Sequence, residues 1–121
     1  MTAHAPAQAA RLRQRRSELR AEIRAQFADH DDPQVMALRN RLDDTDDWAV
    51  ADEMALLDIA QVARDVRELA EVEAALGRIA DGTYGTCADC GATVPAARLD
   101  ANPAARRCIG CQTAVEKREK L

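Results

Sequence analysis

Aromatic residues are almost absent from this chain of 121 residues, which contains one Phe, one Tyr and one Trp. A large globular core is hard to build without such side chains, and the apolar fraction of 47% consists mostly of alanine and aliphatic residues. Because 31% of the residues are charged, the composition favours long, surface-exposed helices over a globule. We therefore expect a mainly α-helical, elongated molecule.

Long apolar segments are also lacking. Residues 1–10 do not contain the apolar segment of a secretory signal, and no run of apolar residues approaches the length that spans a bilayer. In a chain with no export signal, paired cysteines are expected to be reduced metal ligands and not disulfides. The sequence therefore predicts a cytoplasmic protein without a membrane partner.

A net positive charge, which favours binding to a DNA duplex, is missing as well. The net charge is −4, and residues 29–58 hold ten acidic residues against two arginines. Six arginines lie within residues 1–28, on several faces of the predicted helix and without aromatic neighbours for base stacking. This favours a solvated face that pairs with the acidic second helix over a nucleic-acid patch. We expect no sequence-specific DNA binding.

Cysteine occurs at four positions only, and their spacing is informative. Cys87, Cys90, Cys108 and Cys111 form two C-x2-C pairs separated by 17 residues. This spacing is typical of one tetrahedral zinc ion, and four protein ligands leave no coordination position for water or substrate. We expect one structural Zn²⁺ at these four residues. No nucleophile set, open metal site or phosphate-binding glycine loop is evident, so no enzymatic activity is expected.

Hydrophobic periodicity predicts two helical arms before the cysteines. The first covers residues 7–28 and has one narrow apolar stripe, formed by Leu12, Leu19, Ile23 and Phe27. Pro33 predicts a kink or restart at about residues 29–33, after which the stripe resumes at Val35, Leu38 and Leu42. The acidic turn at residues 43–49 follows, since short polar side chains favour turns and helix N-caps.

The second helix is predicted from Asp47 to Asp81, where Gly82 offers a stop. Its apolar residues recur every three or four positions: Ile59, Val62, Val66, Leu69, Val72, Leu76 and Ile79. Two such arms can bury their stripes against each other, so residues 1–82 are predicted to form an antiparallel two-helix coiled-coil hairpin in a monomer. The alternative is a bundle with a second copy of the chain. Residues 83–121 are predicted to form the zinc finger and a C-terminal helix.

A coiled hairpin with an acidic turn, followed by a finger of this spacing, resembles the DksA/TraR family of bacterial transcription factors. The segment from Asp44 to Ala49 fits the family pattern D-x-x-D-x-A, and the segment from Tyr84 to Gly91 fits the opening of the family's finger. The likeness continues through residues 97–103 and 108–111. It covers roughly residues 11 to 121.

The resemblance implies a protein that binds RNA polymerase directly and inserts its hairpin through the secondary channel. It implies that Asp44 and Asp47 perturb initiation complexes and that Ala49 permits close approach. Capping of the second helix is an alternative role for both acids. Trp48 is either a staple against the end of the hairpin or an exposed contact, and the sequence does not decide between the two.

Family members that respond to guanosine tetraphosphate carry basic residues at three places where this chain has Glu71, Asn102 and Gln112. Phosphate recognition depends on charge-assisted hydrogen bonds, so we do not expect this chain to form that nucleotide site. Two other functions fit parts of the sequence: a zinc-dependent redox-sensing holdase, suggested by the cysteines alone, and a coiled-coil adaptor with a structural finger.

Overall fold

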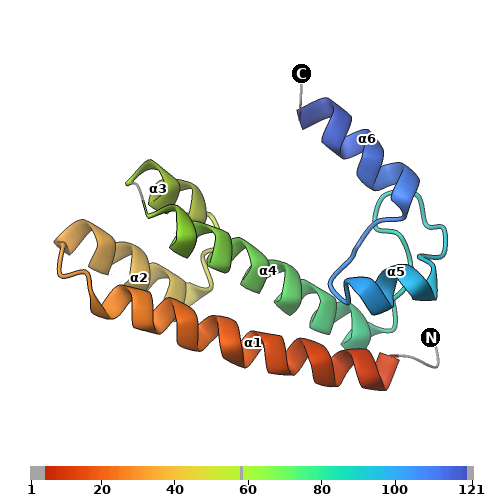
Figure 1. Ribbon diagram of the computed structural model, residues 1–121, viewed down its shortest axis with the longest axis horizontal. Helices are drawn as coiled ribbons and strands as arrows, with labels where there is room; N and C mark the ends of the chain where they lie inside the picture. The colour runs from red at the N-terminus through yellow and green to blue at the C-terminus, as the bar shows by residue number, and fades with distance from the viewer. Residues whose placement is uncertain (1–4, 58, 120–121) are drawn as a thin grey trace. The chain divides into compact units, whose positions relative to one another are not determined.

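The computed structural model describes residues 5–57 and 59–119, and these are mainly helical (Figure 1). The helices are α1 (Ala5–Ala28), α2 (Pro33–Thr45), α3 (Val50–Leu56), α4 (Ala60–Asp81), α5 (Ala96–Ala101) and α6 (Ile109–Glu119). The β structure found in these ranges is an isolated antiparallel bridge between Thr86 and Thr93. Among the described residues, no helix has both the length and the apolar character needed to cross a membrane. The predicted mainly helical fold is confirmed.

The chain divides into two compact units, which are described separately. The finger unit consists of residues 1–14 and 71–121, and the four-helix unit of residues 15–70. The structure thus groups the first turns of α1 and the last turns of α4 with the cysteine segment. The sequence-based division after residue 82 remains a prediction.

The interruption between α1 and α2 has the local chemistry that the sequence predicts. Helix α1 ends at Ala28 and α2 begins at Pro33. The Asp32 carboxylate accepts a hydrogen bond from the backbone N–H of Gln34 at 2.8 Å, which makes Asp32 the N-cap of α2. Proline fits this first turn because its missing N–H would have no partner within the helix. The predicted restart at Pro33 is confirmed.

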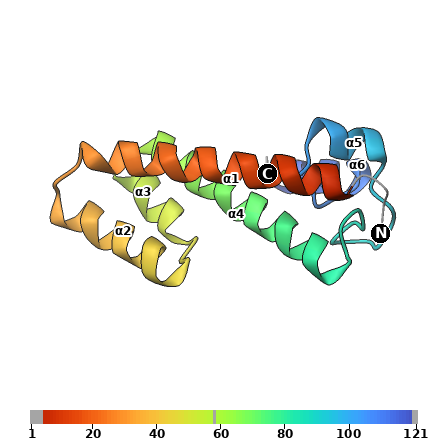
Figure 2. The same cartoon turned by 90° about the horizontal axis from the view of Figure 1, so that it is seen from below.

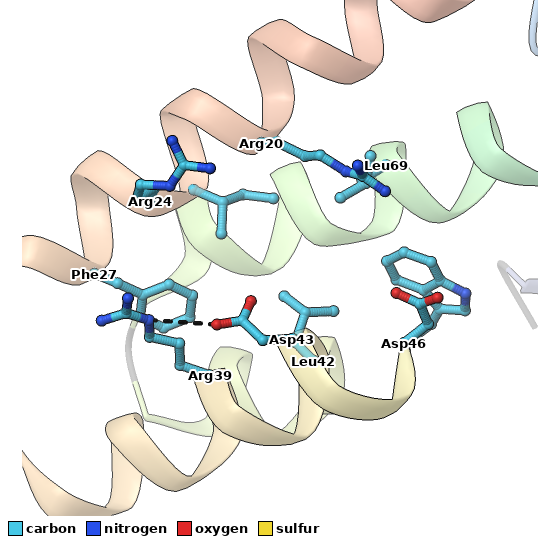
Figure 3. A pocket seen from close by; sticks show the side chains of 10 residues that line it. Arg20, Arg24, Phe27, Arg39, Leu42, Asp43, Asp46 and Leu69 are labelled. Carbon is cyan, nitrogen blue, oxygen red and sulfur yellow. Dashed lines mark ion pairs between the residues drawn. The ribbon is translucent and has the colours of Figure 1, made fainter.

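The sequence predicts a kink or restart near Pro33 but leaves open the direction that α2 takes after it. Figure 2 shows α2 lying beside α1 and running the opposite way. One cavity is lined by Phe27, Arg24 and Arg20 from α1 and by Arg39, Asp43 and Asp46 from the segment around α2. The lining residues of α1 run from Phe27 to Arg20 in the same direction in which those of α2 run from Arg39 to Asp46 (Figure 3). The two helices are therefore antiparallel. The first arm is therefore folded back on itself within the four-helix unit.

The prediction of one continuous helix from Asp47 to Asp81 is wrong. Helix α3 ends at Leu56 and α4 begins only at Ala60. The carbonyl of Met54 accepts hydrogen bonds from the N–H groups of both Leu57 (3.1 Å) and Ile59 (3.2 Å), so the regular helical series stops there. The predicted stop of α4 is confirmed, since the helix ends at Asp81 and Gly82 has a positive φ of 82°.

The predicted apolar stripes form the core of the four-helix unit. Leu19 and Val66 are fully buried, as are Val50 and Met54 of the short helix α3. The remaining buried apolar side chains of this unit are those of Ile23, Phe27, Val35, Leu38, Leu42, Ala51, Val62, Ala63 and Leu69. Helices α2 and α3 pack against each other. Each helix of this unit thus buries the face that carries its apolar stripe, as expected for an amphipathic helix.

An ion pair links α1 to α4 in the four-helix unit. Arg15 donates to Glu68 from Nε at 2.6 Å and from Nη2 at 2.8 Å. These hydrogen bonds lower the pKa of Glu68 below its ordinary value of 4.5, more than partial burial raises it. This bidentate pair agrees with the predicted pairing of the first arm with the acidic second helix.

The Glu68→Gln variant is expected to lose about 0.2–1 kcal/mol of stability at pH 7, because the pair is partly exposed and screened by solvent. A lowered pKa in the folded state means that the stabilisation is present above pH 4.5 and is lost as the pH falls through the folded-state pKa. Urea denaturation of both proteins between pH 3 and pH 7 measures this. Curves that differ by the same amount at every pH would contradict the ionic origin.

Candidate functional site

The first cysteine pair lies on a tight loop at the start of the finger. Cys87 donates its backbone N–H to the carbonyl of Ala92 at 2.7 Å, and its own carbonyl accepts from Gly91 at 3.0 Å. Gly91 has a positive φ of 77°, a conformation that glycine adopts without steric cost. These bonds turn the backbone back on itself, so that Cys87 and Cys90 project their thiols toward the same point.

The second cysteine pair lies at the start of α6. Cys108 directly precedes the helix, and its carbonyl accepts from the backbone N–H of Gln112 at 3.0 Å. Cys111 is in the first turn of α6. A spacing of three residues at a helix start brings both side chains to one side of the backbone. The finger therefore presents two thiols from a loop and two from a helix.

The four sulfur atoms have the arrangement of a tetrahedral metal site. Each cysteine offers its Sγ, and these atoms all lie within 4.8 Å of one another. The Sγ atoms of Cys90 and Cys108 are 3.8 Å apart. A tetrahedral site with Zn–S bonds of about 2.3 Å requires sulfur atoms separated by about 3.8 Å. The donor set and its spacing fit one zinc ion.

The protonation chemistry of the thiols also suits a cation. Backbone hydrogen bonds, chiefly from Cys108 and then from Cys90, lower the pKa of Cys87 to about 6. Hydrogen bonds with the neighbouring sulfurs of Cys90, Cys108 and Cys87 raise the pKa of Cys111 to about 12. A bound Zn²⁺ supplies the positive charge that allows all four sulfurs to be thiolates together.

Polar contacts hold the two cysteine loops in register. Arg107 donates to the Asp89 carboxylate at 2.6 Å, and the backbone N–H of Ala88 donates to the Arg106 carbonyl at 2.8 Å. Arg98 of α5 donates to the Arg107 carbonyl at 2.9 Å. Each bond joins the first cysteine loop or α5 to the segment before the second pair. Such supporting contacts orient the ligands of a metal site.

Helix α1 is also tied to α5 inside the finger unit. Gln8, which is buried, donates to the Asp100 carboxylate at 2.8 Å, and Arg11 donates to the Asp100 carbonyl at the same distance. The Tyr84 hydroxyl donates to the Pro103 carbonyl at 2.8 Å, and burial raises the pKa of Tyr84. The start of α1 therefore forms part of the platform that supports the finger.

In the acidic turn, the four residues singled out from the sequence have different surroundings. Asp44 and Ala49 are exposed, whereas Asp47 and Trp48 are half-buried. Asp46 closes α2 in a left-handed conformation with a φ of 50°, and its N–H donates to the Leu42 carbonyl at 3.1 Å. Aspartate tolerates this conformation better than most residues.

Arg41 is the residue of the acidic turn that sequence reasoning missed. It donates to Asp47 Oδ2 at 2.8 Å and pairs with Glu53 at 2.7 Å. The hydrogen bond from Arg41 is the main cause that lowers the pKa of Asp47. Asp47 also accepts from the N–H of Ala49 at 3.2 Å, so it caps the turn before α3. Residues 29–58 contain ten acidic residues and only two arginines. This imbalance could have identified Arg41 as a partner of the acids in the turn.

The three positions compared with nucleotide-responsive family members have no basic side chain to offer. Glu71 is exposed. The Asn102 side chain accepts from the N–H of Ala104 at 3.2 Å, and Gln112 donates to Glu116 at 3.1 Å. The absence of a guanosine tetraphosphate response stays a prediction.

A helical chain whose four cysteines meet at one point, two from a loop and two from a helix start, is a C4 zinc-finger protein. Residues 82–117 match the family described as the prokaryotic dksA/traR C4-type zinc finger. This part of the chain is therefore similar to the finger of the dksA/traR proteins. The family and the clustered cysteines together support one structural zinc ion.

Several curated proteins are similar to part of the chain. The chain is 34% identical over 74 residues to the RNA polymerase-binding transcription factor DksA of Escherichia coli (strain K12), which is 61% of this chain and 49% of that protein. It is 34% identical over 77 residues to the factor of the same name from Haemophilus influenzae, which is 64% of this chain and 53% of that protein. The chain thus spans about half the length of the curated relatives that it matches.

One solved structure is similar over nearly the whole chain. It is that of transcription factor DksA2 from Pseudomonas aeruginosa, with 28% sequence identity and a TM-score of 0.66. The match covers 99% of this chain and 88% of the other. The fold of a DksA-like protein is therefore confirmed.

Proposed function

We propose that this protein is a transcription regulator that binds RNA polymerase directly, as a monomer in the cytoplasm, and catalyses no reaction itself. The observation that carries this proposal is the combination of the C4 finger with the D-x-x-D-x-A acidic turn in one chain. Relatives that are 34% identical to part of this chain are named RNA polymerase-binding transcription factors. The acidic net charge of −4 agrees with a protein partner and not with a DNA duplex.

The acidic turn is the part that we propose enters the secondary channel of the polymerase. The exposed carboxylate of Asp44 is available to a basic or polar loop, or to the surroundings of a catalytic Mg²⁺, where negative charge is stabilised. The hydrogen bond from Arg41 lowers the pKa of Asp47, so this carboxylate stays ionised to a lower pH than an ordinary aspartate. Ala49 is small and exposed next to these acids, which allows a partner to approach closely.

The metal centre has a structural part in this proposal. The four cysteines would hold Zn²⁺, and the contacts of Arg107 and Arg98 would keep the finger loops in one arrangement. Closed four-cysteine sites of this kind stabilise a fold and leave no open ligand position for chemistry. The finger then acts as a rigid surface, while regulation depends on the acidic turn.

Neutralising the acidic turn tests the proposal. The Asp44→Asn/Asp47→Asn variant is expected to reduce the effect of the protein on open-complex lifetime by about tenfold, because two favourable charge interactions are removed. Asparagine keeps the shape of aspartate and can still cap the turn before α3. The measurement is the decay of open complexes formed with purified polymerase on a promoter that responds to the wild-type protein.

A matched control removes two charges from the same acidic stretch but outside the turn. Asp29 and Asp31 lie between α1 and α2 and are exposed, so Asp29→Asn/Asp31→Asn is expected to act like the wild type. Equal activity of both double variants and the wild type would remove the acidic turn from the mechanism. If none of the three proteins binds polymerase, the proposed function is wrong.

A further inference from the structure

Arg41 of α2 joins three consecutive parts of the four-helix unit. Its Nη2 and Nε donate to Asp47 Oδ2 at 2.8 and 3.1 Å, and its Nη1 lies 2.7 Å from Glu53 Oε2. Asp47 belongs to the acidic turn, and Glu53 lies in the first turn of α3. A guanidinium can serve two carboxylates in this way because its N–H groups point in fixed directions. Arg41 therefore links α2 to the turn and to the helix that follows the turn.

Asp47 is held from a second direction as well. Its Oδ1 accepts from the backbone N–H of Ala49 at 3.2 Å, whereas Oδ2 accepts from Arg41. The carbonyl of Asp47 accepts from the N–H of Val50, the first residue of α3, at 3.2 Å. Both carboxylate oxygens thus have partners within the protein, and the side chain is only 32% exposed. Little of this carboxylate is available to another molecule.

Asp44 has the opposite surroundings in the same turn. It is exposed, and in the part of the chain that the structure describes its carboxylate has no hydrogen-bond or ion-pair partner. Asp46 and Trp48 line the cavity that α1 and α2 share, so this part of the turn packs against the protein itself. Of the two acids in the D-x-x-D-x-A pattern, Asp44 is thus the one whose charge is fully available to a partner.

Polar contacts from α2 are needed to orient the turn. Asp46 has a left-handed φ of 50°, which is unfavourable for a residue with a side chain. Helix α3 has seven residues, too few to be stable alone. Apolar packing holds α2 against α3 but has no preferred direction. Among the described residues, the side-chain hydrogen bonds that reach from α2 across the turn all come from Arg41.

We propose that the two acids of the D-x-x-D-x-A pattern have different roles: Asp44 contacts RNA polymerase, whereas Asp47 and Arg41 hold the turn in the conformation that presents Asp44. Arg41 is then a positioning residue, and its bonds to Asp47 and Glu53 are called the Arg41 clamp. The polymerase contact rests on the proposed function, whereas the clamp stands on the geometry of the four-helix unit. A turn that is ordered before binding loses less conformational entropy on binding.

A double-mutant cycle tests this division of roles. Arg41→Gln and Asp47→Asn each break the clamp, so each is expected to raise the concentration needed for a half-maximal effect on open-complex lifetime by about three- to fivefold. The two changes together are expected to cost no more than one alone, because they remove the same interaction. Asp44→Asn removes the contact itself, so its cost is expected to multiply with that of Arg41→Gln.

The direction of the Arg41 effect separates the proposal from its rival. If Asp47 made the polymerase contact, Arg41 would compete with polymerase for this carboxylate, and Arg41→Gln would strengthen the effect of the protein. A stronger or unchanged effect of this variant would therefore overturn the proposal. Costs of Arg41→Gln and Asp47→Asn that multiply would also overturn it, since independent residues behave in that way.

Two further variants serve as controls. Arg39→Gln removes the same charge from α2, where Arg39 pairs with Asp43 of its own helix at 3.6 Å (Figure 3), and it is expected to act like the wild type. Arg41→Lys keeps the charge but lacks the planar fork that reaches two acids, so it is expected to restore part of the lost effect. A loss in Arg39→Gln equal to that in Arg41→Gln would show that net charge, and not the clamp, matters.

NMR of the free protein tests the clamp without polymerase. Arg41→Gln is expected to raise the pKa of the Asp47 carboxyl toward its ordinary value of 3.8 and to shift the amide signal of Ala49, whereas Arg39→Gln leaves both unchanged. An unchanged Asp47 titration in Arg41→Gln would refute the clamp. A changed titration in a protein that never affects polymerase would sustain the clamp and refute the proposed function. Regulation by the wild type and by Arg41→Gln alike would do the reverse.

Discussion

Loss of zinc is expected to unfold the finger, with the largest effect of any single change to this protein. Apparent binding free energies of structural zinc in small modules are about 10–16 kcal/mol at pH 7, and few apolar residues lie between the two cysteine pairs. Cys87→Ser, at a buried position, is expected to abolish stoichiometric zinc binding and to disorder the loops and α5. Zinc content, together with amide NMR spectra before and after chelation, measures this.

The four-helix unit should withstand zinc removal, because its buried side chains come from residues 15–70. Ala88→Ser is the matched control: it introduces the same hydroxyl next to Cys87 at an exposed position and should bind zinc like the wild type. Since cysteine ligands must be deprotonated, zinc affinity is expected to fall as the pH is lowered. A chelated protein that keeps the dispersed amide signals of its finger would show that the metal is dispensable for the fold.

The Met54→Ala variant is expected to destabilise the four-helix unit by about 2–5 kcal/mol, as large-to-small changes in packed cores do. Met54 is fully buried, although α3 has only seven residues. A helix of this length is not stable on its own, so burial of Val50, Ala51 and Met54 must hold it in place. Urea denaturation followed by the emission of Trp48 measures the loss.

The same helix provides the control for this prediction. Leu56 is 87% exposed, and Leu56→Ala is expected to change the stability by less than about 0.5 kcal/mol. Both variants remove aliphatic side-chain atoms from α3, so only burial distinguishes them. Equal denaturation midpoints for the two variants would show that α3 is not packed as described.

Features encoded by short stretches of sequence could be predicted, and they agree with the structure. The two C-x2-C pairs predict the metal centre because the spacing within each pair brings its two thiols to one side of the backbone. Asp32 and Pro33 start α2, and Gly82 follows the end of α4, because caps and φ preferences are local properties. The buried apolar stripes could also be predicted, because hydrophobic periodicity is a local property of the sequence.

The direction of the chain could not be predicted in this way. Pro33 predicts that a helix stops, but whether α2 continues outward or doubles back is decided by which apolar faces pack together. The break before Ala60 was hidden because Ile59 continues the apolar spacing of α4 backward. The pairing of Arg41 with Asp47 and Glu53 also depends on the tertiary path. The path of the chain is decided by contacts between residues that are distant in the sequence. A local sequence pattern does not specify these contacts.

Helix α6 contains no buried residue among its eleven positions. A helix of that length is marginal in water when it buries nothing. Its first turn holds Cys111, so a bond from this sulfur to a bound zinc ion would provide the nucleus from which the helix can propagate. Loss of the metal is therefore expected to shift α6 toward coil and to remove the ordered surface that this helix presents.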